Sequence, residues 1–189
     1  MLQNKIAIIT GASRGIGKSI ALTYARNGAS LVLICHKDME SLKLVKEKAE
    51  LLGAKVINLA GDIASSNFCN EIIHQTLEKF NTVDILVNCA GTITRSPVEK
   101  MSNEEWHRVI DVNLHSALYL SRNVLPIMRR KKYGKIINLT SQMAYTPHPS
   151  ASPSYEVSKS GMTALTRHLA LKYAKYNICV NNIAPGSID

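Results

Sequence analysis

Three side chains that can exchange a proton with an alcohol oxygen stand in the last third of the chain. Tyr155 and Lys159 are four residues apart, which places them on one face of a helix, and Ser141 precedes the tyrosine by fourteen residues. The ammonium would stabilise the phenolate and bring the tyrosine pKa from about 10 towards neutrality. The serine hydroxyl could hydrogen-bond an oxygen whose charge changes during reaction. These residues indicate acid–base chemistry at an alcohol or carbonyl oxygen.

A glycine-rich turn near the start of the chain indicates a partner for this chemistry. Residues 5–9 form an apolar run that predicts a buried strand, and residues 10–17 (TGASRGIG) follow it directly. A helical pattern then stops at Asn27-Gly28. Strand, glycine turn and helix N-terminus form the arrangement in which backbone N–H groups hold a pyrophosphate. The glycine spacing is not the strict G-x-G-x-x-G, so an ordinary turn stays open as the alternative reading.

Strands and helices alternate along the rest of the chain, without repeats or linkers. This alternation predicts a single α/β domain over residues 1–189, a doubly wound parallel sheet of Rossmann type in three α/β/α layers. Ligands bind such sheets beyond the carboxyl ends of the strands. The expected further strands are residues 31–35, 55–60, 83–88, 135–140 and 178–183; the expected helices are residues 39–52, one built on Ile72, Ile73, Leu77 and Phe80, residues 102–128 opened by a capping box at Ser102 and bent or ended by Pro126, and residues 155–176.

The chain resembles the short-chain dehydrogenases/reductases over essentially its whole length. The motifs that carry the resemblance are residues 10–17, residues 88–91 (NCAG), Asn113, Ser141, Tyr155, Lys159 and Pro185-Gly186, in that order. Within the family it is similar to the 3-oxoacyl-(acyl-carrier-protein) reductases and to the sugar-acid dehydrogenases. Family members normally continue through a substrate cover, a helix and a seventh strand. Because the sequence stops at residue 189, the resemblance implies a C-terminally incomplete domain without its last strand.

The resemblance also implies a role for each site residue. Tyr155 is the general acid in reduction and the general base in oxidation, Lys159 lowers its pKa and binds the nicotinamide ribose, and Ser141 binds the substrate oxygen. Asn113 helps to position Lys159 through a water-linked relay. The implied cofactor-binding residues are Gly11, Ser13, Arg14, Gly15, Ile16, Gly17, His36, Lys37, Asp62, Ile63, Asn88, Ala90, Gly91, Tyr155, Lys159, Pro185, Gly186 and Ile188.

The choice of cofactor follows from charge at the end of the second strand. Family members that use NAD carry an acidic residue there, and those that use NADP carry basic groups. Here the strand ends at Cys35, followed by His36 and Lys37, and Arg14 lies in the glycine turn. NADP(H) is therefore the preferred cofactor and NAD(H) a possible one. Asp62 matches the family residue that caps the adenine, although alone it would fit a helix N-cap equally well.

Composition excludes several other classes of protein. The chain has 189 residues, 46% of them hydrophobic and 20% charged, and no apolar run approaches the ~20 residues that cross a bilayer. The first residues lead directly into the expected strand, without the apolar region and cleavage site typical of a secretory signal, and the four cysteines form no C-x-x-C pair. They indicate small buried residues in a reducing cytoplasm. The six histidines show no metal-ligand spacing, so we expect no metal.

The net charge of +9 raises the question of whether the chain binds nucleic acid. The densest basic cluster, residues 129–132, has no interleaved aromatic residues and suits the end of a helix. We expect no nucleic-acid partner. An acidic carrier protein or a phosphorylated cofactor accounts for the charge.

The expected function is NADP(H)-dependent hydride transfer to the carbonyl of a small-molecule or carrier-bound substrate. The first hypothesis is a 3-oxoacyl-(acyl-carrier-protein) reductase. The alternative is a sugar-acid or other small polar alcohol dehydrogenase. The loop over residues 147–153, which is one residue longer than usual, favours this alternative. A non-catalytic dinucleotide sensor is the third hypothesis. Extra apolar residues on two helices indicate a homotetramer, unless the sheet and a neighbouring helix cover them all: Leu114, Ala117, Leu118 and Leu120; Met162, Leu165, Leu169 and Ala170.

Overall fold

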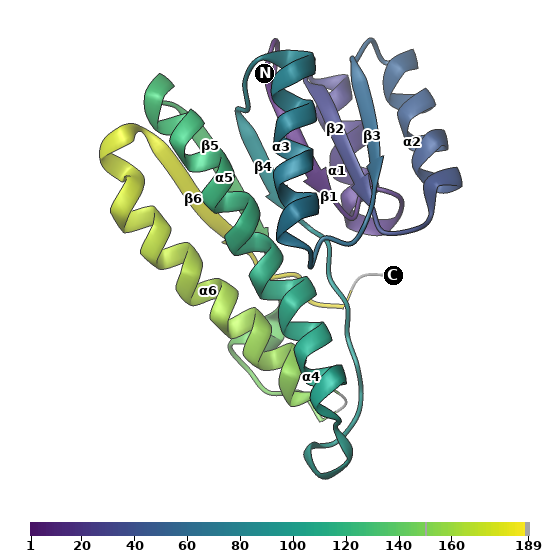
Figure 1. Cartoon of the computed structure of the whole chain (residues 1–189), viewed down its shortest axis with the longest axis vertical. Helices are drawn as coiled ribbons and strands as arrows, with labels where there is room; N and C mark the ends of the chain where they lie inside the picture. The colour runs from purple at the N-terminus through teal and green to yellow at the C-terminus, as the bar shows by residue number, and fades with distance from the viewer. Residues whose placement is uncertain (150, 188–189) are drawn as a thin grey trace.

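The computed structural model describes residues 1–149 and 151–187 and contains one six-stranded sheet. All five strand pairings are parallel, in the order β3-β2-β1-β4-β5-β6 (Figure 1). The chain winds outward from β1 in one direction and then from β4 in the other, so the strand order reverses between them. This arrangement confirms the doubly wound sheet. The strands are β1 (Ile6–Thr10), β2 (Ser30–Cys35), β3 (Val56–Ala60), β4 (Ile85–Asn88), β5 (Gly134–Leu139) and β6 (Ile178–Ile183).

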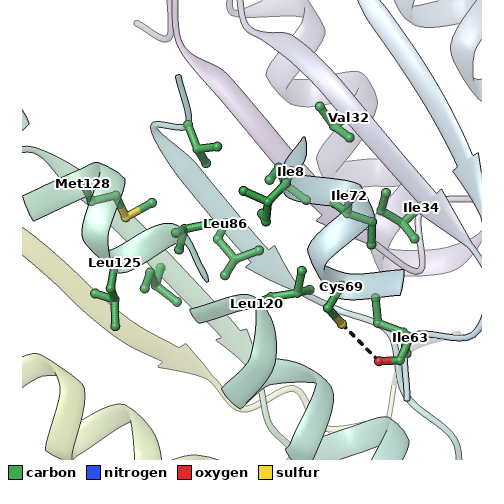
Figure 2. Close-up of a cluster of buried hydrophobic side chains, with 14 of the residues drawn as sticks. Ile8, Val32, Ile34, Ile63, Cys69, Ile72, Leu86, Leu120, Leu125 and Met128 are labelled. Atoms are coloured by element: carbon green, nitrogen blue, oxygen red, sulfur yellow. Dashed lines mark hydrogen bonds between the residues drawn. The ribbon is translucent and has the colours of Figure 1, made fainter. Parts of the chain in front are cut away.

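Helices cover both faces of the sheet because successive strand residues point to opposite sides. Ile8 packs with Ile72 and Leu120 from helices on one face (Figure 2), whereas Ala7 and Ile9 pack with helices on the other. Within the described ranges, no helix is long and apolar enough to cross a membrane. The helices are α1 (Gly15–Arg26), α2 (Met39–Leu51), α3 (Ser66–Phe80), α4 (Asn103–Ile110), α5 (Ser116–Lys131) and α6 (Pro153–Tyr173), with 3-10 turns η1 (Val98–Lys100), η3 (Gln142–Ala144) and η4 (Ala174–Tyr176).

The helix expected over residues 102–128 differs from the structure in its middle and at its end. A π-helical turn, η2 (Asp111–His115), separates α4 from α5. Pro126 does not end α5, which continues to Lys131. The buried side chains of Leu125 and Met128 flank the proline, and their burial offsets the backbone hydrogen bond that it cannot donate. Ser102 caps α4 as expected, its hydroxyl accepting from the Glu105 N–H at 3.1 Å.

Candidate active site

Two glycines, one in the turn after β1 and one in the first turn of α1, are packed too closely for larger residues. The Thr10 hydroxyl oxygen accepts hydrogen bonds from the backbone N–H groups of Cys89 (3.0 Å) and Ala90 (2.9 Å), which ties the end of β1 to the loop after β4. Gly11 has a φ of +67°, and a Cβ there would lie 3.0 Å from the Ala90 Cα. A Cβ on Gly17 would lie 2.2 Å from the Gly11 carbonyl oxygen. Glycine at these positions allows the turn, α1 and the β4 loop to meet.

The N-terminus of α1 is suited to an anion. Its N-cap residue Arg14 makes no side-chain capping hydrogen bond, whereas Asp38, Ser65, Ser102 and Ser152 cap α2, α3, α4 and α6. Gly15 has a φ of +53° and open space where a Cβ would stand. The first-turn N–H groups of α1 are thus left for a ligand, and the positive end of the helix dipole favours a phosphate there. The residues present fit the pyrophosphate of a dinucleotide.

A cavity of about 560 Å³ extends from this turn along the carboxyl ends of the strands. Twelve of the residues expected to bind cofactor line it: Gly11, Ser13, Arg14, Gly15, Ile16, Gly17, His36, Lys37, Asp62, Ile63, Ala90 and Gly91. Because the cavity lies at the reversal of strand order, it has the position in which sheets of this kind bind ligands.

The three residues expected to carry the chemistry line a second cavity of about 310 Å³. Ser141, Tyr155 and Lys159 contribute to its wall, together with Pro185 and Gly186. It adjoins the larger cavity, because both are lined by Ile16, Cys89, Gly91 and Thr92. Ser141 caps η3, its hydroxyl accepting from the Met143 N–H at 3.2 Å. The fold therefore brings together residues from the end of β5 and the first turns of α6.

Lys159 is buried beneath the second cavity. Its side chain is 4% exposed, and its Nζ donates to the Leu139 carbonyl oxygen at 2.7 Å. The same nitrogen lies 5.7 Å from the centroid of the Tyr155 ring. Burial lowers the pKa of Lys159 to about 8, an effect that the neighbouring Cys89 thiol partly opposes. Among the described residues, no carboxylate forms an ion pair with it.

Asn113 occupies the π-helical turn and holds the loop after β4. Its Oδ1 accepts from the Thr92 N–H at 2.8 Å, and its Nδ2 donates to the Thr92 carbonyl (2.9 Å) and to Ser158 Oγ (3.0 Å). Gly91 lies beside this clamp: a Cβ there would be 3.4 Å from Asn113 Oδ1 and 3.6 Å from Lys159 Nζ. The side chain of Asn113 thus fixes the wall of the site, and its role in a proton relay stays a prediction.

Among the expected cofactor residues that the structure describes, Asn88 is placed differently from the rest. Asn88 lines neither cavity; its Nδ2 donates to Asn138 Oδ1 at 2.8 Å, and Asn138 donates in turn to Thr166 Oγ1 at 2.8 Å. This buried chain connects β4, β5 and α6. Ile188 lies outside the described residues.

Two charged side chains of the larger cavity were missed by the sequence reasoning. Arg108, on α4, donates to Asp62 Oδ2 at 2.6 Å. Burial alone would raise the pKa of Asp62, but the Arg108 guanidinium and the Ala64 N–H hold it below its ordinary value. Asp38 follows the strand end, and its hydrogen bonds from Ser41 keep its pKa low, with Arg14 adding to the effect. The position of Asp38 three residues after Cys35 was the signal available for it.

The cysteines are only partly as expected. Cys35 and Cys69 are buried and Cys89 is partly buried, but Cys179 is exposed on β6, where Lys135 Nζ lies 2.9 Å from its sulfur. The prediction of burial was wrong for Cys179, because outward residues of β6 are uncovered here. All four are free thiols, and no cluster of metal-ligating side chains occurs within residues 1–149 and 151–187.

Known proteins are similar to this chain in sequence and in fold. The sequence profile of the short chain dehydrogenases matches residues 5–189. The chain is 33% identical over 188 residues to general stress protein 39 of Bacillus subtilis, covering 99% of this chain and 65% of that protein. It is 35% identical over 185 residues to the 3-oxoacyl-(acyl-carrier-protein) reductase FabG of Staphylococcus epidermidis, covering 98% and 75%. The crystal structure of an NAD⁺-bound xylitol dehydrogenase superposes with a TM-score of 0.92 at 28% identity, covering 98% of this chain and 71% of that one.

The fold and the site define a dinucleotide-binding α/β protein. The parallel sheet has a cavity where its strand order reverses, and a glycine turn and an uncapped helix N-terminus line that cavity. The matched profile and the identity to these relatives specify the family. The chain belongs to the short-chain dehydrogenase/reductase family of oxidoreductases, whose members bind a nicotinamide dinucleotide.

Proposed function

We propose that the chain is an NADP(H)-dependent oxidoreductase that interconverts a carbonyl and a secondary alcohol. The observation that carries the proposal is the position of Ser141, Tyr155 and Lys159 around one cavity that adjoins the glycine-turn cavity. The chemistry that a nicotinamide dinucleotide supplies when bound is hydride transfer. The experiment that tests it is NADPH oxidation with a panel of 3-oxoacyl thioesters, sugar acids and diketones. Absence of turnover with tight dinucleotide binding would favour the non-catalytic sensor.

The side chains of the second cavity divide the proton chemistry among them. The Tyr155 phenol gives a proton to the substrate oxygen in reduction and takes it back in oxidation. The Lys159 ammonium, 5.7 Å from the ring centroid, attracts the negative charge that develops on the phenol. The Ser141 hydroxyl donates to the same substrate oxygen and holds it towards Tyr155. Lys159 also binds the nicotinamide ribose, and Asn113 supports the lysine through water.

The charged side chains where the larger cavity passes the end of β2 support NADP(H) over NAD(H). Arg14, His36 and Lys37 line it, and the end of β2 carries Cys35 where an acidic residue would bind ribose hydroxyls. Asp38 opposes this preference, although its carboxylate accepts a hydrogen bond from the Ser41 N–H at 3.1 Å as the cap of α2. The xylitol dehydrogenase of similar fold binds NAD⁺, so NAD(H) is the alternative.

Replacing Arg14 with alanine is expected to weaken NADPH binding about tenfold or more and NADH binding much less, because a charged hydrogen bond to the extra phosphate is lost. Dissociation constants from the fluorescence of the reduced cofactors measure this difference. Lys18→Ala, which removes a cation from the next turn of α1, is the control. Equal losses for both cofactors would assign Arg14 a structural role.

For the substrate, we propose a 3-oxoacyl group on an acyl carrier protein. The similarity to the Staphylococcus epidermidis reductase supports it, as do the exposed cations Arg130 and Lys132 at the end of α5, which suit an acidic carrier. The second candidate is a small polar alcohol, favoured by the similarity to the xylitol dehydrogenase. Comparison of kcat/KM for a carrier-bound substrate, its short thioester mimic and a polyol discriminates between them.

We also propose that the chain acts in the cytoplasm as a homotetramer. Ala117, Leu120, Met162 and Leu169 are buried within one chain and need no partner. Leu118 is 39% exposed and lines a groove of about 370 Å³ between α5 and α6. A second subunit packed along these helices would cover that groove.

Leu118→Glu is expected to lower the assembly to dimers or monomers, because the interface would lose an apolar contact and would have to desolvate a carboxylate. Sedimentation velocity at micromolar concentration measures the mass. Leu171→Glu, at a position that is 86% exposed and outside the groove, should leave the mass unchanged. A wild-type chain that sediments as a monomer would contradict the proposed assembly.

A further inference from the structure

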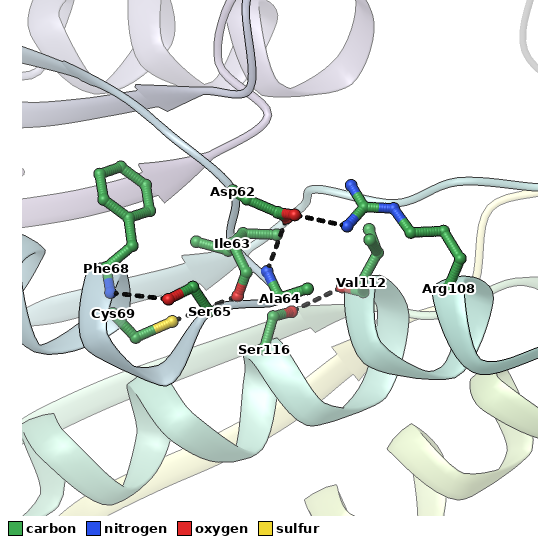
Figure 3. A network of polar contacts seen from close by, with 9 residues as sticks. All are labelled: Asp62, Ile63, Ala64, Ser65, Phe68, Cys69, Arg108, Val112 and Ser116. Atoms are coloured by element: carbon green, nitrogen blue, oxygen red, sulfur yellow. Dashed lines mark hydrogen bonds and ion pairs between the residues drawn. The ribbon is translucent and has the colours of Figure 1, made fainter. Parts of the chain in front are cut away.

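The larger cavity contains, beside the end of β3, an ion pair between two segments that are distant in the sequence. Asp62 follows β3, and Arg108 belongs to α4, one turn before Val112 (Figure 3). Both charged residues line the cavity together with Ile63 and Val112. Their side chains are 42% and 43% exposed, so the pair meets whatever enters this part of the cavity.

The Asp62 carboxylate is held through both of its oxygens. Oδ1 accepts from the Ala64 N–H at 3.0 Å, and Oδ2 accepts from Arg108 Nη1 at 2.6 Å. The first contact comes from the carboxylate's own turn, whereas the second depends on α4. Arg108 therefore determines the rotation of the carboxylate and supplies its counter-charge.

The position of the pair specifies the part of a dinucleotide that it faces. With the pyrophosphate at the N-terminus of α1 and the ribose at the end of β2, the base lies beyond them at the end of β3. At position 6 a 6-aminopurine presents N–H donors that a carboxylate accepts, while a 6-oxopurine presents an acceptor there and carries its donor at N1 instead. A base over Asp62 also removes water from the carboxylate, which is costly without a counter-charge.

We propose that Arg108 is a positioning residue that makes this site selective for a 6-aminopurine over a 6-oxopurine. It acts through Asp62, whose charge and orientation it maintains when the base covers the carboxylate. The inference rests on the proposed dinucleotide function and adds a determinant on α4 to it. An exposed ion pair that served only to join α4 to the sheet would add little to stability and nothing to base selectivity.

The test measures dissociation constants of NADPH and NADH and of their hypoxanthine analogues, by fluorescence of the reduced nicotinamide. We expect the wild-type chain to prefer adenine about tenfold or more, as suits a charged hydrogen bond. Arg108→Gln should reduce the preference to within about threefold, mainly by weakening the adenine cofactors, and Arg108→Lys should retain part of it because the charge remains. Arg26→Gln, at an exposed position in the last turn of α1 and outside the cavity, is the matched control.

A double-mutant cycle separates action through Asp62 from direct contact. In an Asp62→Asn background, whose amide both donates and accepts, Arg108→Gln should cause no further change in the adenine preference. A preference unchanged by Arg108→Gln, or equal losses for adenine and hypoxanthine cofactors, would overturn the inference and leave the dinucleotide function standing. A loss confined to NADPH would overturn it too, because the arginine would then bind the phosphate. Failure of the wild-type chain to bind any of the four compounds would overturn both.

Discussion

Tyr155→Phe is expected to lower kcat about a thousandfold, because the ring remains but the proton that it transfers is gone. The dissociation constant for the dinucleotide should change little, since the Lys159 ammonium and the glycine turn are untouched. Single-turnover NADPH oxidation with the best substrate of the panel measures the rate, and cofactor fluorescence measures binding.

Tyr145→Phe is the matched control for this substitution. Tyr145 is 61% exposed, lines neither cavity, and uses its hydroxyl to accept from Asn182 Nδ2 at 2.9 Å. It should keep most of the wild-type rate. If Tyr155→Phe retained more than about a tenth of that rate, Tyr155 would not be the general acid.

Gly17→Ala is expected to abolish measurable dinucleotide binding and to lower the free energy of unfolding by about 1–3 kcal/mol. The added Cβ would stand 2.2 Å from the Gly11 carbonyl oxygen and 2.8 Å from its carbon, so α1 must move away from the turn. That movement displaces the first-turn N–H groups that hold the pyrophosphate. Urea denaturation and isothermal titration of the cofactor measure the two effects.

Gly53→Ala distinguishes a displaced helix from general backbone strain. Gly53 has a φ of +89° with open space around a Cβ, so alanine there costs about 1–2 kcal/mol through its left-handed conformation alone. It should destabilise the chain and leave cofactor binding intact. Wild-type affinity in Gly17→Ala would show that the close contact between turn and helix can relax.

The sequence predicted the sheet and many of the residues that line the candidate site, because both depend on local patterns. Apolar runs bounded by glycine specify buried strands, and Tyr155 and Lys159 share a helix face by spacing alone. Ser141 and Gly91 reach the second cavity because they follow strands whose carboxyl ends meet at one edge of the sheet. The resemblance supplied the roles of these residues.

The rest depends on contacts between distant segments. Arg108 meets Asp62 across 46 residues, and Asn113 reaches Thr92 across 21. Asn113 lies in the π-helical turn, whose extra residue rotates the side chains of α4, Arg108 among them, relative to those of α5. A regular 3.6-residue pattern could not give that rotation. The sequence also could not show that Leu120 and Met162 are buried within one chain. An apolar stripe on a helix predicts that the stripe is covered, but it does not indicate whether the same chain or a second subunit covers it.

The burial of Lys159 against a neutral carbonyl makes folding release a proton. Between about pH 8 and the ordinary lysine pKa of 10.5, the unfolded chain keeps a proton that the folded chain has lost, so the free energy of unfolding due to this group rises with pH in that window. The buried thiols of Cys35, Cys69 and Cys89 have raised pKa values and act in the opposite direction above pH 9. Urea denaturation at several pH values gives the free energy of unfolding of the wild type and of Lys159→Met. The difference between the two pH profiles isolates the contribution of the lysine. The site thus keeps a charge that destabilises the free protein at neutral pH. An anionic or hydrogen-bond-accepting ligand bound to this ammonium would raise its pKa, and binding would then take up protons from solution at about pH 8 and above.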